Sequence, residues 1–172
     1  MKKTKQEEQN RASSKDESAK KREFSHAGQM LSFSSHEINC ALDVRVARQV
    51  SPELTGMRGR VLGLIVRHIR QGKAVYQRDL ETWFHIGRSS VTTMLQGMEQ
   101  AGFILREPVE RDARLKSLVP TEKGLECAGR LANCIDRFEG DLQNGITCEE
   151  MSSLQSILEK MLANAQQIRN EK

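Results

Sequence analysis

The chain has 172 residues, a formal net charge of +4 and a pI near 9.0, and 29% of its residues are charged. This length allows one folded domain with a modest extension, and the mild basic excess favours an anionic partner. No apolar run is long enough for a secretory signal or a membrane span, so we predict a cytoplasmic protein without membrane contacts. The sequence also lacks a phosphate-cradling loop, a metalloprotease helix and a nucleophile elbow, which predicts that the protein is not an enzyme.

Residues 1–25 mix Lys, Glu, Gln, Ser and Asn without any apolar periodicity. Such a segment buries too little surface to fold alone, so we expect a disordered basic and polar tail. The first helix is expected at about residues 36–49, where Ile38, Leu42 and Val46 form one stripe. Residues 26–54 make up the N-terminal helical region of the predicted fold.

The four cysteines, at positions 40, 127, 134 and 148, show no C-x-x-C pairing, which argues against a disulfide framework. Cys127 and Cys134 lie seven apart among apolar residues and are expected to be small core side chains. Cys40 leaves three interpretations open: a buried inert thiol, a redox-sensing thiol one turn from His36, or a metal ligand with His36 and Glu37. Because the last offers too few ligands, we predict no metal site, and nothing in the sequence indicates a cofactor.

A second helix is expected at about residues 55–71, with Val61, Leu64, Ile65 and Ile69 on its apolar side. Its polar side carries several arginines, which fit either a solvated surface or an approach to phosphates; they are Arg58, Arg60, Arg67 and Arg70.

Residues 76–101 predict two helices joined by a tight turn. In the first, residues 76–84, Leu80, Trp83 and Phe84 share one stripe and are expected to be buried. The turn at residues 85–87 contains Gly87, which is free to adopt unusual backbone angles.

The next helix is expected at residues 88–101, ended by Gly102 as a C-terminal cap. Its apolar positions, Val91, Met94, Leu95 and Met98, fall three, four and seven residues apart and belong in the core. Polar side chains then occupy the other faces, where short groups can approach base edges and phosphates, and an ordinary solvated face is the alternative. The candidate residues are Arg88, Ser89, Ser90, Thr92, Thr93 and Gln96.

A β-hairpin is expected next, with strands at residues 103–106 and 115–119 around a charged loop at residues 107–114. Arg111 and Arg114 in this loop suit a phosphate backbone or a narrow minor groove, and Asp112 can hold one of them in place. Alternatively, all three are surface charges.

Two long helices are expected in residues 121–172, the first capped by Thr121 and the two joined at Asn144-Gly145. In each, apolar residues alternate steps of three and four, a seam that suits packing against another helix of the same chain or of a second subunit. We regard dimerisation as the better explanation.

The order of these motifs resembles the MarR family of bacterial winged helix-turn-helix transcription regulators. The similarity rests on Ile86-Gly-Arg-Ser-Ser-Val-Thr92, Gly102-Phe-Ile104, Arg111-Asp-Ala-Arg114 and Thr121-Glu-Lys-Gly124, spread over about fifty residues. It differs at Gly87, where the family often has Ser or Thr, at Thr93, where it often has Arg, and at Pro120, where it usually has Leu.

The resemblance implies a mainly α-helical fold with a small β-hairpin. A winged helix-turn-helix domain at residues 55–120 would lie between dimerisation helices at residues 26–54 and 121–172. It also implies a homodimer on a pseudo-palindromic operator in double-stranded DNA, with the recognition helix in the major groove and the Asp112–Arg114 element beside the minor groove. A small-molecule effector would bind between the dimer helices and the winged domain.

We therefore predict a sequence-specific DNA-binding transcription regulator, acting as a ligand-responsive dimeric repressor. The alternative is a protein-interaction adaptor that uses a winged-helix surface without reading DNA.

Overall fold

The computed structural model describes residues 26–109 and 112–171. The predicted tail at residues 1–25 lies outside this range. The elements follow the order α2 (Ala27–Gln49), η1 (Pro52–Leu54), α3 (Met57–Arg70), α4 (Gln77–Phe84), α5 (Arg88–Gln100), β1 (Ile104–Val109), β2 (Asp112–Pro120), α6 (Glu122–Leu142) and α7 (Cys148–Asn170). This is the mainly helical fold with one hairpin that the sequence predicts.

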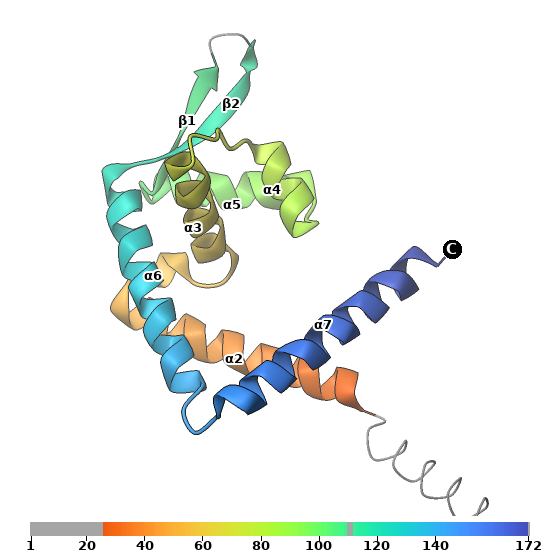
Figure 1. Ribbon diagram of the computed structural model, residues 1–172. Helices are drawn as coiled ribbons and strands as arrows, with labels where there is room; N and C mark the ends of the chain where they lie inside the picture. Colours follow the sequence, from red (N-terminus) through yellow and green to blue (C-terminus); the bar gives the residue numbers. More distant parts are fainter. Residues whose placement is uncertain (1–25, 110–111, 172) are drawn as a thin grey trace, which may run out of the picture.

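The helices α3, α4 and α5 and the β1–β2 hairpin form one end of the molecule, and α6 leads from β2 back towards α2 (Figure 1). The hydrophobic core lies mostly at this end and is built from side chains of α3, α4, α5, β1, β2 and α6. Val61, Leu80, Leu95, Met98 and Phe103 are all 0% exposed. The winged part of the chain therefore contains the core that holds the recognition elements in place.

The helix-turn-helix follows from local sequence signals. The Asp79 carboxylate accepts a hydrogen bond of 2.8 Å from the Tyr76 backbone N–H, which fixes the start of α4. The predicted helix boundaries agree with α4 and α5, but the turn differs from expectation. His85 adopts the left-handed conformation with φ of 51°, whereas Gly87 has an ordinary extended conformation. Position 87 therefore does not require glycine for its backbone angles.

Gly102 ends α5 with φ of 76°, as predicted for a C-terminal cap. The amide of Gly102 donates to the Glu99 carbonyl and that of Phe103 to the Met98 carbonyl, both at 2.9 Å. These bonds satisfy carbonyl groups at the helix end and turn the chain directly into β1.

The hairpin strands are longer than predicted. They pair in antiparallel register from Ile104–Pro120 to Pro108–Lys116, with an irregularity after Pro108. Residues 107–109 and 112–114, expected in the loop, belong to the strands. Residues 107–109 pair with β2, and ladder pairing stabilises extended backbone whatever the side-chain charge. Tyr76 adds an isolated bridge to Ser117, which ties the start of α4 to the hairpin.

The helix α6 begins as predicted, with the Thr121 hydroxyl accepting from the Gly124 amide at 2.9 Å. Cys127 and Cys134 are buried, as expected for core cysteines. The other end of α6 packs on α2, where Arg45 pairs with Asp141 at 2.7 Å and lies over the Phe138 ring.

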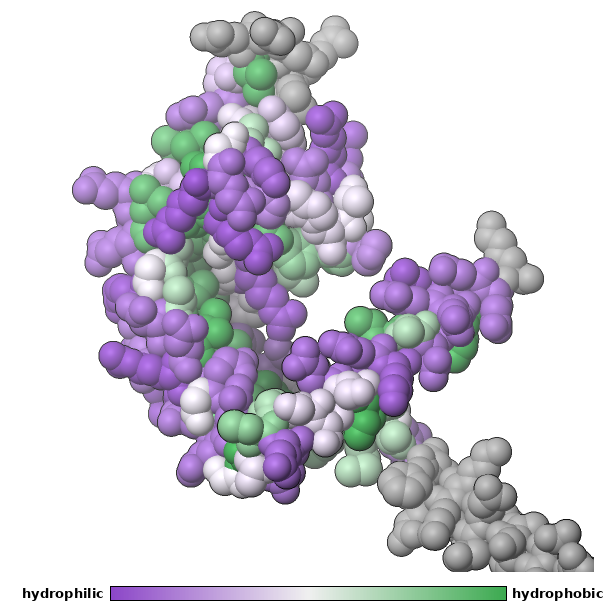
Figure 2. Space-filling view, in the orientation of Figure 1, coloured by the Kyte–Doolittle hydropathy of each residue, from purple (hydrophilic) through white to green (hydrophobic). Residues whose placement is uncertain are grey.

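The helix α7 buries none of its residues within the described chain and leaves the body as an arm (Figure 1). Pairing of α6 with α7 along their apolar seams is therefore not the arrangement in this chain. Apolar patches are visible along this arm in Figure 2. The exposed large apolar side chains of α7 are Leu154, Ile157, Leu158, Leu162 and Ile168.

The helix α2 starts at Ala27, nine residues before the predicted start, and only Val46 is buried in it. Its N-terminal half has little amphipathic pattern, and Met30 and Phe33 are 69% and 68% exposed. Both α2 and α7 thus present apolar side chains that no other described part of the chain covers.

Candidate nucleic-acid interface

The outer surface of α5 consists of polar side chains. Val91, Leu95 and Met98 point into the core, which leaves Ser89, Thr93 and Gln96 exposed on the opposite face. Ser90 is also exposed, to one side of this face. Four of the six residues predicted for α5 therefore lie on or beside its free surface.

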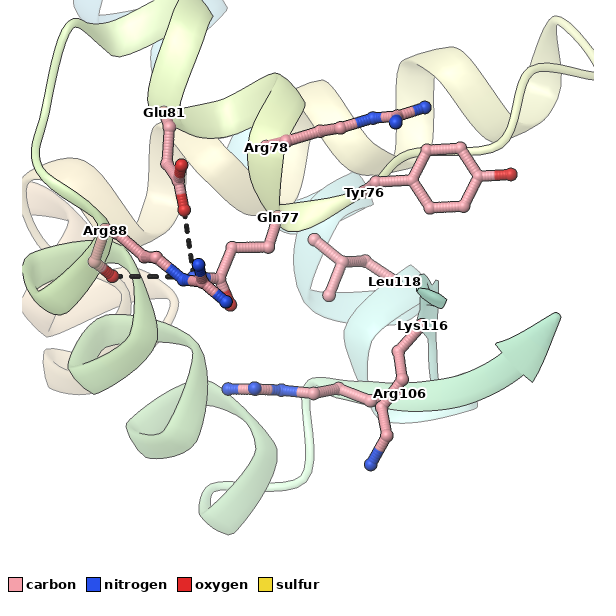
Figure 3. Close-up of a pocket in the computed structure, with 8 residues that line it drawn as sticks. All are labelled: Tyr76, Gln77, Arg78, Glu81, Arg88, Arg106, Lys116 and Leu118. Carbon is pink, nitrogen blue, oxygen red and sulfur yellow. Dashed lines mark hydrogen bonds between the residues drawn. The ribbon is translucent and has the colours of Figure 1, made fainter. Parts of the chain in front are cut away.

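The other two predicted residues, Arg88 and Thr92, lie on the side of α5 that faces α4. Thr92 is half-buried, and its hydroxyl donates to the Arg88 carbonyl at 2.8 Å and accepts from the Gln77 amide at 2.9 Å. The Gln77 amide also lies within hydrogen-bond distance of Glu81 and of the Arg88 carbonyl (Figure 3). The hydroxyl of Thr92 therefore helps to hold α4 against α5, whereas the Arg88 side chain is exposed.

Arg106 of β1 connects the hairpin to α5. Its side chain is 17% exposed, with Nε 3.4 Å from Glu99 Oε2 and Nη2 donating to the Thr92 carbonyl at 3.4 Å. Nε makes no hydrogen bond within the described chain, so its attraction to Glu99 is mainly electrostatic. These contacts fix the wing beside the recognition helix.

A cavity of about 410 Å³ lies between α4, the start of α5 and the hairpin. Figure 3 shows Arg106 extending from the hairpin towards α5, with Lys116 on the neighbouring strand. Four basic side chains and one carboxylate, that of Glu81, line the cavity. The basic residues are Arg78, Arg88, Arg106 and Lys116. The sequence interpretation missed Arg78, Arg106 and Lys116, because only the packing of α4 and of the folded hairpin around α5 brings them together.

Two of the three predicted wing residues lie in the described part of the hairpin. Arg111 is outside the described residues, and the backbone of Asp112 and Arg114 belongs to β2. The hairpin projects from the same end of the molecule that carries α5 (Figure 1). The polar helix face and the wing therefore share one scaffold, as the sequence predicted.

Trp83 was expected to be buried but is 40% exposed, while Leu80 in the same helix is 0% exposed. Its ring stacks on His68 of α3 with centroids 4.6 Å apart. An aromatic ring that can stack on a neighbour does not need full burial, which explains the difference.

Cys40 is exposed, so the interpretation as a buried inert thiol does not hold. Its Sγ lies 3.6 Å from His36 Nε2. No group of three or more His, Cys, Asp or Glu side chains is placed to hold a metal ion among residues 26–109 and 112–171. In the same ranges, every helix is too short or too polar to span a bilayer.

The comparisons with known proteins agree with this geometry. Residues 61–116 match the model of the MarR family. The chain is 26% identical over 107 residues to the uncharacterized HTH-type transcriptional regulator YybA of Bacillus subtilis, which covers 62% of this chain and 70% of that protein.

Two solved structures have a similar fold. The transcription regulator MarR from Oenococcus oeni PSU-1 is 28% identical, with a TM-score of 0.61 over 80% of this chain and 98% of the other. The MepR–DNA complex of S. aureus is 23% identical, with a TM-score of 0.69 over 80% and 96% of the two chains. With its polar recognition helix, its adjoining wing and the match over residues 61–116, this chain carries a MarR-family domain and is similar to transcription regulators of that family.

Proposed function

We propose that the protein is a dimeric repressor that binds a pseudo-palindromic operator in double-stranded DNA and releases it when a small molecule binds. The observation that carries the proposal is the free polar face of α5 beside a hairpin fixed to the same helix by Arg106. A helix of this kind fits the major groove, where short polar side chains reach base edges. The adaptor alternative is not favoured, because the structures with a similar fold include a regulator solved in complex with DNA.

The contacts to DNA are proposed as follows. Base edges are read from the outer face of α5 by Ser89, Ser90, Thr93 and Gln96, while Arg88 and Thr92 lie towards the wing side. The hairpin end, with Arg111, Asp112 and Arg114, reaches the adjacent minor groove or its phosphates. Residues 55–120 thus form the DNA-binding domain.

The homodimer is supported by the uncovered apolar side chains of α2 and α7. Leu162 and Ile168 are 60% and 68% exposed, although they lie on a 23-residue helix that buries nothing in its own chain. Large exposed apolar surfaces on a folded chain indicate a partner. Residues 26–54 and 121–172 of two copies would cover each other and set two recognition helices about 34 Å apart, the spacing of successive half-sites.

The effector site is proposed at the junction between the dimer helices and the winged domain. A cavity of about 280 Å³ lies there between α2, α3 and α6, lined by Leu42, Val46, Met57, Leu131 and Ile135 among others. A ligand held there would change DNA affinity only if it bound more tightly to the dimer conformation with one spacing of the recognition helices than to a conformation with another spacing.

Two further proposals complete this account. The protein acts in the cytoplasm, where its DNA target would be. Exposure and the neighbouring His36 imidazole support Cys40 as a redox-sensing thiol. Alkylation of the native protein followed by peptide mapping tests this, and an unreactive Cys40 would contradict it.

Selection of bound fragments from fragmented genomic DNA tests the proposed function. Fragments recovered at low salt are then titrated at several salt concentrations, where log K should fall with log salt by about 0.9 per neutralised phosphate. Recovery of a shared pseudo-palindrome with a steep salt dependence supports the repressor. No binding to any fragment at low salt would contradict it and favour the adaptor.

A further inference from the structure

Gly97 occupies an unusual position for a glycine, three residues from the end of a regular helix. Its φ is not in the left-handed region, so neither a turn nor a cap requires glycine there. An interior glycine destabilises a helix by about 1 kcal/mol relative to alanine. Gly97 differs from the helical glycines Gly63, Gly129 and Gly140, where an added Cβ would meet nothing within 4 Å, because a side chain of another helix lies against it.

The side chain that lies against Gly97 is that of Arg58 from α3. A Cβ added at Gly97 would lie 3.0 Å from Arg58 Nη2 and 3.4 Å from Cζ. The guanidinium thus rests on the backbone of α5 at the one position that has no side chain. Among the described residues, Arg58 forms no ion pair, in contrast to Arg45 and Arg106.

Arg58 also lies next to the proposed base-reading face. It lines an open groove together with Thr55 and Met57 of the α3 region and with Ser89, Ser90, Thr93 and Met94 of α5. Among the described residues that line this groove, Arg58 alone has a basic side chain. It sits on the side of α5 opposite the cavity of Figure 3, which holds Arg78, Arg88 and Lys116.

A helix in the major groove has a phosphate backbone on each side, because the groove is only about 12 Å wide. The wing side of α5 has several basic side chains to face one backbone. On the far side, the groove beside Ser90 and Met94 would face the other strand. An unpaired guanidinium at that place has the charge and reach for a phosphate oxygen.

We propose that Arg58 is a further DNA-contacting residue, which binds the phosphate backbone on the side of the recognition helix away from the wing, and that Gly97 makes room for it. This inference rests on the proposed DNA binding by α5. It adds a contact from α3, an element outside the helix-turn-helix and the wing, and leaves base readout to α5.

The test compares Arg58→Gln, Arg58→Lys and Arg67→Gln by fluorescence anisotropy on a labelled operator and on an unrelated duplex, across several salt concentrations. Arg67 is a matched control, because it is an exposed arginine of the same helix about 180° around the axis from Arg58. Thermal unfolding of each variant shows whether the fold is intact.

We expect Arg58→Gln to weaken binding to both duplexes by about tenfold for each engaged recognition helix, the effect of one lost charged hydrogen bond per subunit. Its salt slope should fall by about 0.9 for each engaged recognition helix. Arg58→Lys should keep the wild-type slope, and Arg67→Gln should keep both affinity and slope.

Wild-type affinity and slope in Arg58→Gln would overturn the inference, as would equal losses in Arg58→Gln and Arg67→Gln. A loss confined to the operator would overturn the phosphate assignment. If the wild-type protein itself bound neither duplex, the proposed function would fail instead, so the two failures are distinguishable.

Discussion

Gly124, in the first turn of α6, allows a direct test of how this helix joins the wing. Glycine to alanine inside a helix ordinarily raises stability by about 0.5–1 kcal/mol. At Gly124 the structure predicts the opposite sign. A Cβ there would lie 2.0 Å from the Phe103 carbonyl oxygen and 3.1 Å from its carbon, and both are backbone atoms that cannot rotate away.

The magnitude follows from these contacts. Overpacking costs about 1–3 kcal/mol when neighbours can adjust, and a backbone contact places Gly124→Ala at or above the upper end. After the helix-propensity gain, the net loss should be about 2 kcal/mol, which lowers Tm by about 4–8 °C for a chain of this size. Phe103 is 0% exposed, so the core also resists the shift.

The matched control is Gly129→Ala in the same helix, where a Cβ would meet nothing within 4 Å. It should be neutral or stabilising. Thermal unfolding at equal protein concentrations, followed by circular dichroism and by fluorescence of Trp83, the one tryptophan of the chain, measures both variants. A Gly124→Ala variant as stable as Gly129→Ala would refute the close packing of α6 on the Phe103 backbone before β1.

Three further outcomes are expected. Leu95→Ala, which empties a site that is 0% exposed, should cost about 2–5 kcal/mol in denaturant unfolding, and a loss under about 1 kcal/mol would contradict the core described here. Leu162→Glu on α7 should give a monomer in sedimentation analysis if the exposed apolar face is the dimer contact, while an unchanged dimer would place that contact elsewhere. Hydrogen bonds from the backbone N–H and the hydroxyl of Thr147 lower the pKa of Glu150. The cap therefore stabilises α7 fully at pH values above the ordinary carboxyl pKa, and this stabilisation is lost as the pH falls through the lowered pKa. The protection factors of amides at the start of α7 should therefore fall in acid in the wild type but change less in Glu150→Gln, whose side chain does not titrate, and equal acid responses would contradict this capping.

Local signals made part of this fold predictable. The boundaries of α4 and α5, the Gly102 cap and the Thr121 cap depend on residues within one or two turns, so the sequence carries them directly. The polar face of α5 is likewise a matter of spacing along one helix.

Features set by tertiary contacts were not predictable in this way. Trp83 satisfies the helical spacing of a core residue, yet its stacking on His68 depends on how α3 and α4 lie together. In the sequence, nothing distinguishes Arg106 from an ordinary charged residue of a strand. Only the folded hairpin brings its Nε within 3.4 Å of Glu99 Oε2. The same holds for Arg58, whose position over Gly97 joins helices far apart in the sequence.

The extent of α2 escaped prediction for a different reason. Its N-terminal half buries no residue in its own chain, so no amphipathic stripe marks the helix. Where a helix packs against another molecule, the positions of its apolar residues depend on the surface of that molecule.

The central claim is that the outer face of α5 lies against DNA, and a negative charge introduced on that face tests it most directly. Thr93→Glu places a carboxylate at an exposed position in the middle of this face, and Asn133→Glu makes the same charge change at an exposed position on α6. Anisotropy titration of the selected operator should show a loss of at least about tenfold for Thr93→Glu, because repulsion is added to a lost contact. Asn133→Glu should bind like the wild type. Equal operator affinity in Thr93→Glu and the wild type would contradict the account.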